Sequence, residues 1–221
     1  MDPGFGFDII WKLLLWAPPV ILAVTLHEMG HGWVAKQLGD PTAADLGRLT
    51  LNPLKHIDPF GTLLLPALLI ITKAGFIFGW AKPVPVNWRN LKHLRRDMAL
   101  VALAGPGANV LQALFWVAVV WLGYAAYLGS PLLNRALISM GEVGIISNVA
   151  LVAFNLIPLP PLDGSRVLTA LLPRKMAIYY NKLEPFGLVI VMVLLLLGWM
   201  DELVGPLLHI GERLVSPLLP H

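Results

Sequence analysis

The sequence predicts an all-α polytopic membrane protein with about four to six transmembrane helices and a short β-hairpin or re-entrant element. Of its residues, 57% are hydrophobic, and the mean hydropathy is +0.73. Only 13% are charged, against about 25% in a typical soluble domain. The apolar residues also come in blocks of about 20, the length that a helix needs to cross the hydrocarbon core. Because a soluble core needs no blocks of that length, we expect the chain to lie in a membrane.

We expect the 221 residues to form a single integral membrane domain, 1–221, because the predicted membrane segments leave no room for a soluble domain of ordinary size. The sequence contains no cysteine. Disulfides, thiolate zinc sites and a cysteine nucleophile are therefore excluded, and a metal site must use His, Asp, Glu or Asn. The first residues lack the basic start and the small-residue cleavage site of a signal peptide, so the first hydrophobic segment is expected to remain as an anchor.

The first apolar block predicts one long, kinked spanning helix over residues 9–38. Pro18 and Pro19 remove backbone donors inside it, and the Gly39–Pro41 turn ends it. Residues 42–59 combine turn residues with a short alternating run, which predicts a loop or β-hairpin.

The next apolar stretch is short. Phe60–Thr72 has 13 residues, too few for a comfortable span, and the Pro83–Val86 run after it is expected to be extended. We therefore predict a re-entrant or short spanning element over 60–80. The remaining chain predicts three spans and an interfacial tail, which are 98–128, 137–156 and 185–200, with the tail at 203–219.

The basic residues favour the re-entrant interpretation of 60–80. If this element enters and leaves on one side, thirteen of the sixteen Lys and Arg share that side, and only Lys12, Arg135 and Arg213 lie opposite. The positive-inside rule then places the larger group in the cytoplasm. If the element crosses once, the bias disappears. The basic residues lie beside apolar spans, so the formal charge of +3 reports orientation, and no nucleic-acid partner is expected.

A polar cluster, His27-Glu28-Met29-Gly30-His31, interrupts the first apolar block. Residues four apart on a helix share a face, so both imidazoles can reach one metal ion. Glu28 lies beside that ion and can act as general base on a bound water. An accidental motif is the alternative. His and Glu are costly inside an apolar span unless they serve a site, so we favour the metal interpretation.

A catalytic zinc ion normally takes three protein ligands, so a third must come from elsewhere. The remaining histidines lie in predicted loops, the basic segment or the tail, and are interpreted as solvated or interfacial. Asp163 follows a proline-broken segment after a span and precedes Gly164, so irregular backbone can present its carboxylate to the membrane interior. An Asx turn or a helix cap at Asp163 explains the same pattern equally well.

The chain resembles the site-2 protease family of intramembrane zinc metalloproteases. The resemblance covers roughly residues 10–190 and rests on these segments: His27–His31, Ala104–Pro106 with Asn109, Asn155–Gly164, Gly47–Pro53 and Gly79–Asn87. It looks like the compact bacterial type without PDZ or CBS domains.

This resemblance implies that His27, His31 and Asp163 bind Zn²⁺ and that Glu28 activates a water molecule. Asn155 matches the family asparagine near the metal, which implies a role in orienting substrate or stabilising the oxyanion. The alternative role for Asn155 is hydrogen bonding to the proline-broken backbone.

Two other family segments receive weaker interpretations. Asn109 is interpreted as a helix-packing residue. Pro83–Asn87 is either a plain loop, which we favour, or a sheet edge that binds an extended substrate.

The expected function is hydrolysis of peptide bonds within or near transmembrane segments of membrane proteins, as in regulated intramembrane proteolysis. The expected location is the plasma membrane of a prokaryote, and the expected partners are transmembrane protein or peptide substrates and the lipid bilayer. The alternative is a membrane metal transporter or metal-binding sensor, which would also place His and Asp in spans but would not require an acid directly after the first ligand. A structural scaffold would leave Glu28 without a purpose.

Overall fold

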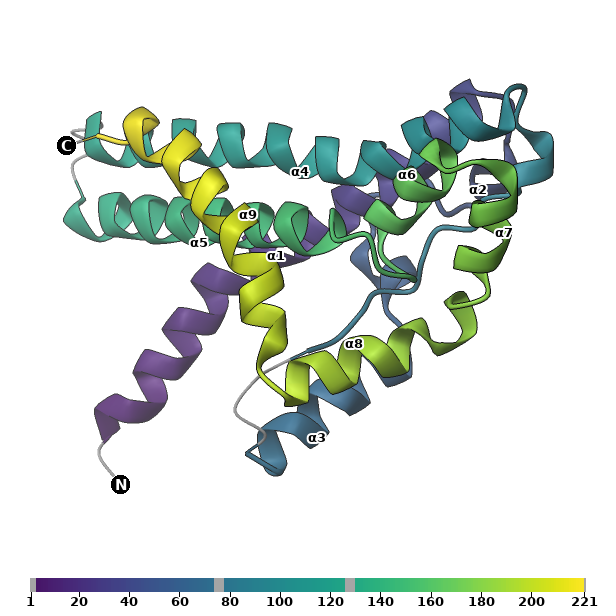
Figure 1. Ribbon diagram of the computed structural model, residues 1–221. Coiled ribbons are helices and arrows are strands. Elements are labelled where there is room, and N and C mark those ends of the chain that lie inside the picture. Colours follow the sequence, from purple (N-terminus) through teal and green to yellow (C-terminus); the bar gives the residue numbers. More distant parts are fainter. Residues whose placement is uncertain (1–2, 74–77, 126–129, 221) are drawn as a thin grey trace.

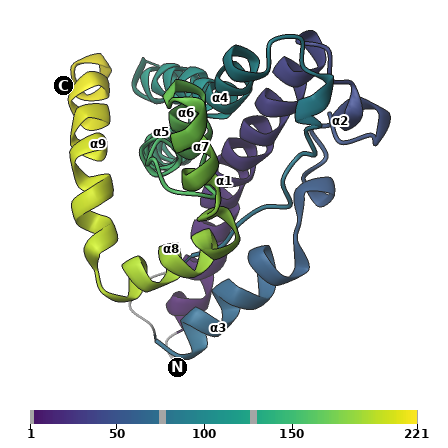
Figure 2. The ribbon, with the colours of Figure 1, turned by 45° about the vertical axis from the view of Figure 1, so that its right-hand side comes forward.

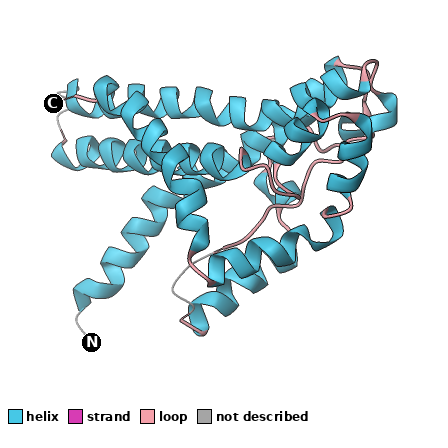
Figure 3. Ribbon diagram, in the orientation of Figure 1, coloured by secondary structure: helices cyan, strands magenta, loops and turns pink. Residues whose placement is uncertain are grey.

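The computed structural model of the protein describes residues 3–73, 78–125 and 130–220. Within these ranges the regular secondary structure is helical and no residue lies in a β-strand (Figure 3). The helices are α1 Pro3–Gln37, α2 Thr42–Asp45, α3 Leu65–Ile71, α4 Leu94–Ala125, α5 Pro131–Asn155, α6 Asp163–Leu171, α7 Arg174–Asn181, α8 Gly187–Leu196 and α9 Trp199–Val215. Short 3-10 or π-helical turns complete the order: η1 Pro53–His56, η2 Pro59–Leu64, η3 Trp88–Asn90, η4 Glu184–Phe186 and η5 Ser216–Leu218.

Three helical stretches of the described residues are long and apolar enough to cross a membrane. They are Leu94–Ala125, Pro131–Asn155 and Arg174–Leu196. A shorter apolar helical stretch covers Pro59–Ile71. These lengths confirm the predicted all-α membrane protein.

Helices α4 and α5 form a long antiparallel pair (Figure 1). Glycines on both helices allow the close approach, since a Cβ at Gly144 would overlap the ring of Trp116 and one at Gly141 would overlap Val120. Small residues at such interfaces let membrane helices bring their backbones together. Trp116 and Val120 are buried, together with Val215 at the end of α9, so this pair and α9 share one apolar cluster.

Helix α1 crosses the pair and contacts both α4 and α5. Different elements lie at the two ends of the α4–α5 pair (Figure 1). Helices α2, α6 and α7 gather at one end, and the last turns of α4 lie at the other, near the start of α5 and the C-terminus. The first end holds most of the basic segments assigned above to the cytoplasmic side, which fits the predicted orientation.

Of the two alternatives predicted for 42–59, a loop or a β-hairpin, the β-hairpin is not found, since none of these residues lies in a strand. This segment forms the short helix α2 and the turn η1, because the Asn52 side chain accepts the amide hydrogen of Leu54 and starts a helical turn at Pro53. Pro83–Asn87 has no regular secondary structure and pairs with no described strand, as expected for the favoured plain loop. It lies alongside α1 (Figure 2), and a Cβ added at Gly32 of α1 would stand 2.8 Å from the Val84 side chain.

Several predicted boundaries also shift. The 60–80 element consists of η2 and α3, and its residues 74–77 lie outside the described residues, as do 126–128 of the predicted 98–128 span. The predicted 185–200 span divides at Gly198, whose φ of +72° is readily adopted only by glycine. The predicted tail 203–219 belongs to α9 and η5, and α9 packs along α5, where Gly211 lies against Val149.

Candidate metal centre

His27 and His31 lie one turn apart on α1, and their imidazoles face α4. Glycines make room for them on both helices. A Cβ at Gly105 of α4 would overlap both imidazole rings, and a Cβ at Gly30 of α1 would stand 2.7 Å from the carbonyl oxygen of Ala104. The two backbones can therefore approach closely, and the rings lie directly against α4.

The Nδ1 atom of each imidazole is bonded to an acceptor on α4. His31 Nδ1 lies 2.7 Å from the carbonyl oxygen of Val101, and His27 Nδ1 lies 2.5 Å from Oδ1 of Asn109. An oxygen of either kind can only accept, so each Nδ1 carries a proton, and in the neutral imidazole each Nε2 then presents a lone pair. In metal sites, a hydrogen bond from the ring nitrogen that does not bind the metal orients the imidazole in the same way.

Asp163 is the first residue of α6, which follows the irregular segment after α5. This segment brings Asp163 close to the two histidines. A Cβ at Gly164 would overlap the carbonyl groups of Leu156 and Ile157, so only glycine permits this fold of the chain. Leu162 occupies the N-cap position of α6 and makes no side-chain cap. The Asp163 carboxylate points instead at the imidazoles, which favours the ligand interpretation over the cap.

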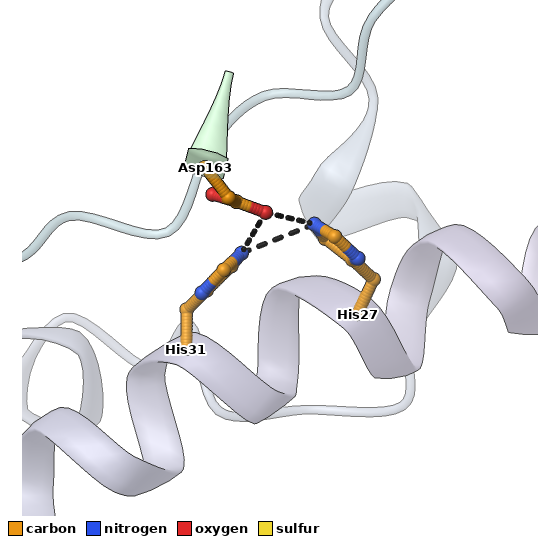
Figure 4. Close-up of side chains that lie close together, drawn as sticks. All are labelled: His27, His31 and Asp163. Atoms are coloured by element: carbon orange, nitrogen blue, oxygen red, sulfur yellow. Dashed lines mark hydrogen bonds and ion pairs between the residues drawn. The ribbon is translucent and has the colours of Figure 1, made fainter. Parts of the chain in front are cut away.

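The three side chains converge on one point (Figure 4). Asp163 Oδ2 lies 3.2 Å from His27 Nε2 and 3.3 Å from His31 Nε2, and the two Nε2 atoms are 3.0 Å apart. Among the described residues, this is the one group of three His, Cys, Asp or Glu side chains close enough to share a metal ion.

The donor set fits a divalent cation. Asp163 Oδ2 is buried and has no hydrogen-bond partner, although both Nε2 atoms lie within 3.3 Å of it. Two lone pairs and a carboxylate oxygen would repel one another at these distances without positive charge between them. Two imidazoles and one carboxylate are also the protein ligands of a known class of catalytic zinc sites, in which the fourth position stays open.

Glu28 borders the same space. Its Oε2 accepts a hydrogen bond from the backbone N–H of Val84 at 2.7 Å, so the extended Gly79–Asn87 segment holds this carboxylate in place. A cavity of about 570 Å³ adjoins these groups, and most of its wall is apolar. Its polar lining is the two histidines, Glu28, Asp163, Asn155, Arg166 and Glu184.

Asn155 ends α5 and lines the cavity. Its Nδ2 donates to the carbonyl oxygen of Leu151 at 3.0 Å, a bond within its own helix and not to the proline-broken backbone. Pro83, Val84 and Val86 also line the cavity.

The structure gives Asn109 a role beyond the predicted helix packing, because it binds His27 directly. Its signal in the sequence is an amide in the middle of an apolar span, where a polar side chain needs a partner. His56 differs from its prediction as well. It is 3% exposed, and its Nε2 bonds to the carbonyl of Thr50, so it is a buried structural residue of the 42–59 segment.

Comparison with known proteins gives one family. Residues 122–198 match the model of peptidase family M50. A Bacillus subtilis protein named "Putative zinc metalloprotease YwhC" is 38% identical over 201 residues, which are 90% of this chain and 88% of that protein. A Mycolicibacterium smegmatis protein named "Putative zinc metalloprotease Rip2" is 34% identical over 189 residues, which are 83% of this chain and 69% of that protein. Its Mycobacterium tuberculosis H37Rv namesake is 32% identical over 183 residues, 81% and 67% of the two chains. No solved structure gives a significant match.

Proposed function

The chain belongs to peptidase family M50, and on that premise we propose that His27, His31 and Asp163 hold the zinc ion of this membrane metalloprotease while Glu28 serves as its general base. The activity is that of an intramembrane zinc metalloprotease. The observation that carries the residue assignment is the convergence of two imidazole Nε2 atoms and one buried carboxylate oxygen within 3.3 Å of one another.

A bound zinc ion supplies Lewis-acid polarisation of a carbonyl group and a water of lowered pKa. Side chains of this protein carry out the proton transfer and the binding of the substrate. Glu28 accepts the proton of the attacking water and later delivers it to the leaving amine. The Val84 amide holds one carboxylate oxygen of Glu28, and the other remains available for this transfer. We propose that Asn155, which lines the cavity, hydrogen-bonds the substrate backbone near the scissile bond.

The apolar cavity wall suits a substrate segment that comes from the bilayer. A peptide group inside a regular spanning helix is already hydrogen-bonded and shielded, so the substrate segment must unwind locally before attack. We propose that the chain acts in this way in the plasma membrane of a prokaryote, in regulated intramembrane proteolysis, and that residues 1–221 act as one domain.

The test compares membranes that contain the wild type or Glu28→Gln. The variant should retain zinc and accumulate uncut transmembrane fragments, because only proton transfer is removed. Glu142→Gln in α5 is the matched control, since Glu142 is exposed and outside the cavity. Cleavage by Glu28→Gln at the wild-type rate would refute the role of Glu28 as general base.

A further inference from the structure

Two asparagines lie fully buried between the long helices. Asn109 of α4 and Asn148 of α5 are both 0% exposed. An amide in an apolar span is costly unless all its hydrogen-bonding groups are used. Both side chains belong to one chain of hydrogen bonds that ends at His27.

The direction of these bonds can be followed from α5 inward. Asn148 Nδ2 donates to the carbonyl of Gly144 at 2.8 Å, so Asn148 Oδ1 faces α4 as an acceptor. Asn109 Nδ2 donates to that Oδ1 at 2.7 Å and to the carbonyl of Ala23 at 3.0 Å. Its two N–H groups are then both used, and its Oδ1 faces His27 Nδ1 at 2.5 Å.

The reverse arrangement is disfavoured at every contact. If the Asn109 amide were flipped, its oxygen would face two other oxygens, those of Asn148 and Ala23. Its NH₂ group would face His27 Nδ1, which would have to give up its proton. That proton would then sit on Nε2 and point at Asp163, where it would occupy the position of a metal ligand's lone pair.

We propose that Asn148 is a positioning residue of the metal centre, which acts through Asn109 to keep the proton of His27 on Nδ1 and its Nε2 free for the metal. This inference rests on the proposed zinc role of His27 and extends it to a residue two hydrogen bonds away on another helix. His31 needs no such chain, because a backbone carbonyl, that of Val101, holds its Nδ1. His27 is therefore the ligand whose tautomer depends on side chains.

The experiment measures zinc affinity by competition with a chelator in the purified full-length protein. Removing an outer-shell partner of a metal ligand typically weakens metal binding about 10–100-fold. We expect a loss of that size for Asn109→Leu and a loss of up to about tenfold for Asn148→Leu. Asn148→Asp keeps an acceptor toward Asn109 and should recover most of the affinity.

Gln112→Leu is the matched control. Gln112 lies one turn beyond Asn109 on α4, is buried and donates to the same Ala23 carbonyl at 3.4 Å, but makes no bond to an imidazole. Gln112 Oε1 has no hydrogen-bond partner, and the Ala23 carbonyl still accepts from Asn109. Replacing Gln112 therefore leaves no new unsatisfied polar group. This variant should bind zinc like the wild type, which separates positioning of His27 from helix packing.

A second readout does not use the metal. Nitrogen-15 NMR of histidine-labelled, zinc-free protein reports the tautomer of His27, identified by the signal that His27→Ala removes. The wild type should show the proton on Nδ1, and Asn148→Leu should show a mixture of tautomers. If Asn148→Leu does not fold, Asn148→Ala takes its place in both measurements.

The outcomes separate the two proposals. Wild-type affinity and a single Nδ1–H tautomer in Asn148→Leu would overturn the positioning role of Asn148. Unchanged zinc affinity in His27→Ala would instead overturn the proposed metal site, whatever the asparagines do.

Discussion

Glu28 Oε2 and the backbone N–H of Val84 form a 2.7 Å hydrogen bond across the cavity. Pro83 and Pro85 flank Val84 and have no N–H group. Val84 is therefore the one backbone donor of the Pro83–Pro85 run, and the proposed general base uses it.

Val84→Pro should slow peptide hydrolysis, because it removes this donor and frees the Glu28 carboxylate. A hydrogen bond to a charged group contributes about 1.5–3 kcal/mol, so we expect kcat to fall by about 10–100-fold with zinc content unchanged. Val84→Ala keeps the N–H and is the control for lost side-chain contacts. Equal kcat values for the proline and alanine variants would show that the bond does not position the base.

Gly105→Ala should weaken zinc binding by at least about tenfold, since the new methyl group would displace both imidazoles. Gly107→Ala is a matched control on the same helix, because nothing lies within 4 Å of a Cβ there. Alanine is the better helix former by about 1 kcal/mol, so the control should be as stable as the wild type or more so. Zinc titration of both variants tests the contact, and similar affinities would contradict it.

Asp163→Ala should remove the third protein ligand and leave a site that loses zinc during purification. The metal content of the purified variant, measured by mass spectrometry, should fall from one ion per chain toward zero. Glu142→Gln should keep its full content. A zinc ion retained by Asp163→Ala would mean that another group completes the site.

Asp40 should stabilise the junction between α1 and the segment before α4. Burial alone would raise the pKa of Asp40, but hydrogen bonds from Thr42, Asn90 and the backbone N–H of Asn87 outweigh it and lower that pKa below 3.8. The carboxylate bonds to Asn87 and Asn90 are 2.7 and 2.8 Å long.

The sign of the pH dependence follows from this depressed pKa. The stabilisation is fully present above the unfolded-state pKa and is lost as the pH falls through the lower, folded-state value. Asp40→Asn should therefore lower the unfolding temperature at pH 6, and its difference from the wild type should shrink below about pH 4. Thermal unfolding at several pH values measures this, and a difference that stays constant to pH 3 would count against it.

The sequence alone predicts which side chains lie close together where their spacing along one helix decides the geometry. His27, Glu28 and His31 fall within two turns of α1, so their proximity follows from helix periodicity alone. Asp163 could not be assigned by that argument, because the cap and ligand alternatives use the same local pattern. In the structure the Asp163 carboxylate lies within 3.3 Å of both imidazoles, which favours the ligand alternative.

Long-range side-chain pairing was beyond the sequence pattern. The bond between Asn109 and His27 depends on how α4 crosses α1, and the bond to Asn148 depends on the register of α5. For 42–59 the sequence predicts a loop or a β-hairpin, because alternation over a few residues does not distinguish a strand from short helical turns. Here the side chains of Asn52 and Asp58 accept backbone N–H groups and start such turns.

The proposed zinc ligands come from opposite halves of the chain, His27 and His31 from α1 and Asp163 from α6. Synthesis on the ribosome proceeds from the N-terminus, so the imidazoles enter the membrane well before the aspartate has been translated. On the proposed assignment, a nascent or truncated product that stops before α6 carries two of the three donors and should not cleave neighbouring membrane proteins. Proteolytic competence should then require that the second half of the polypeptide has been inserted and has folded against the first.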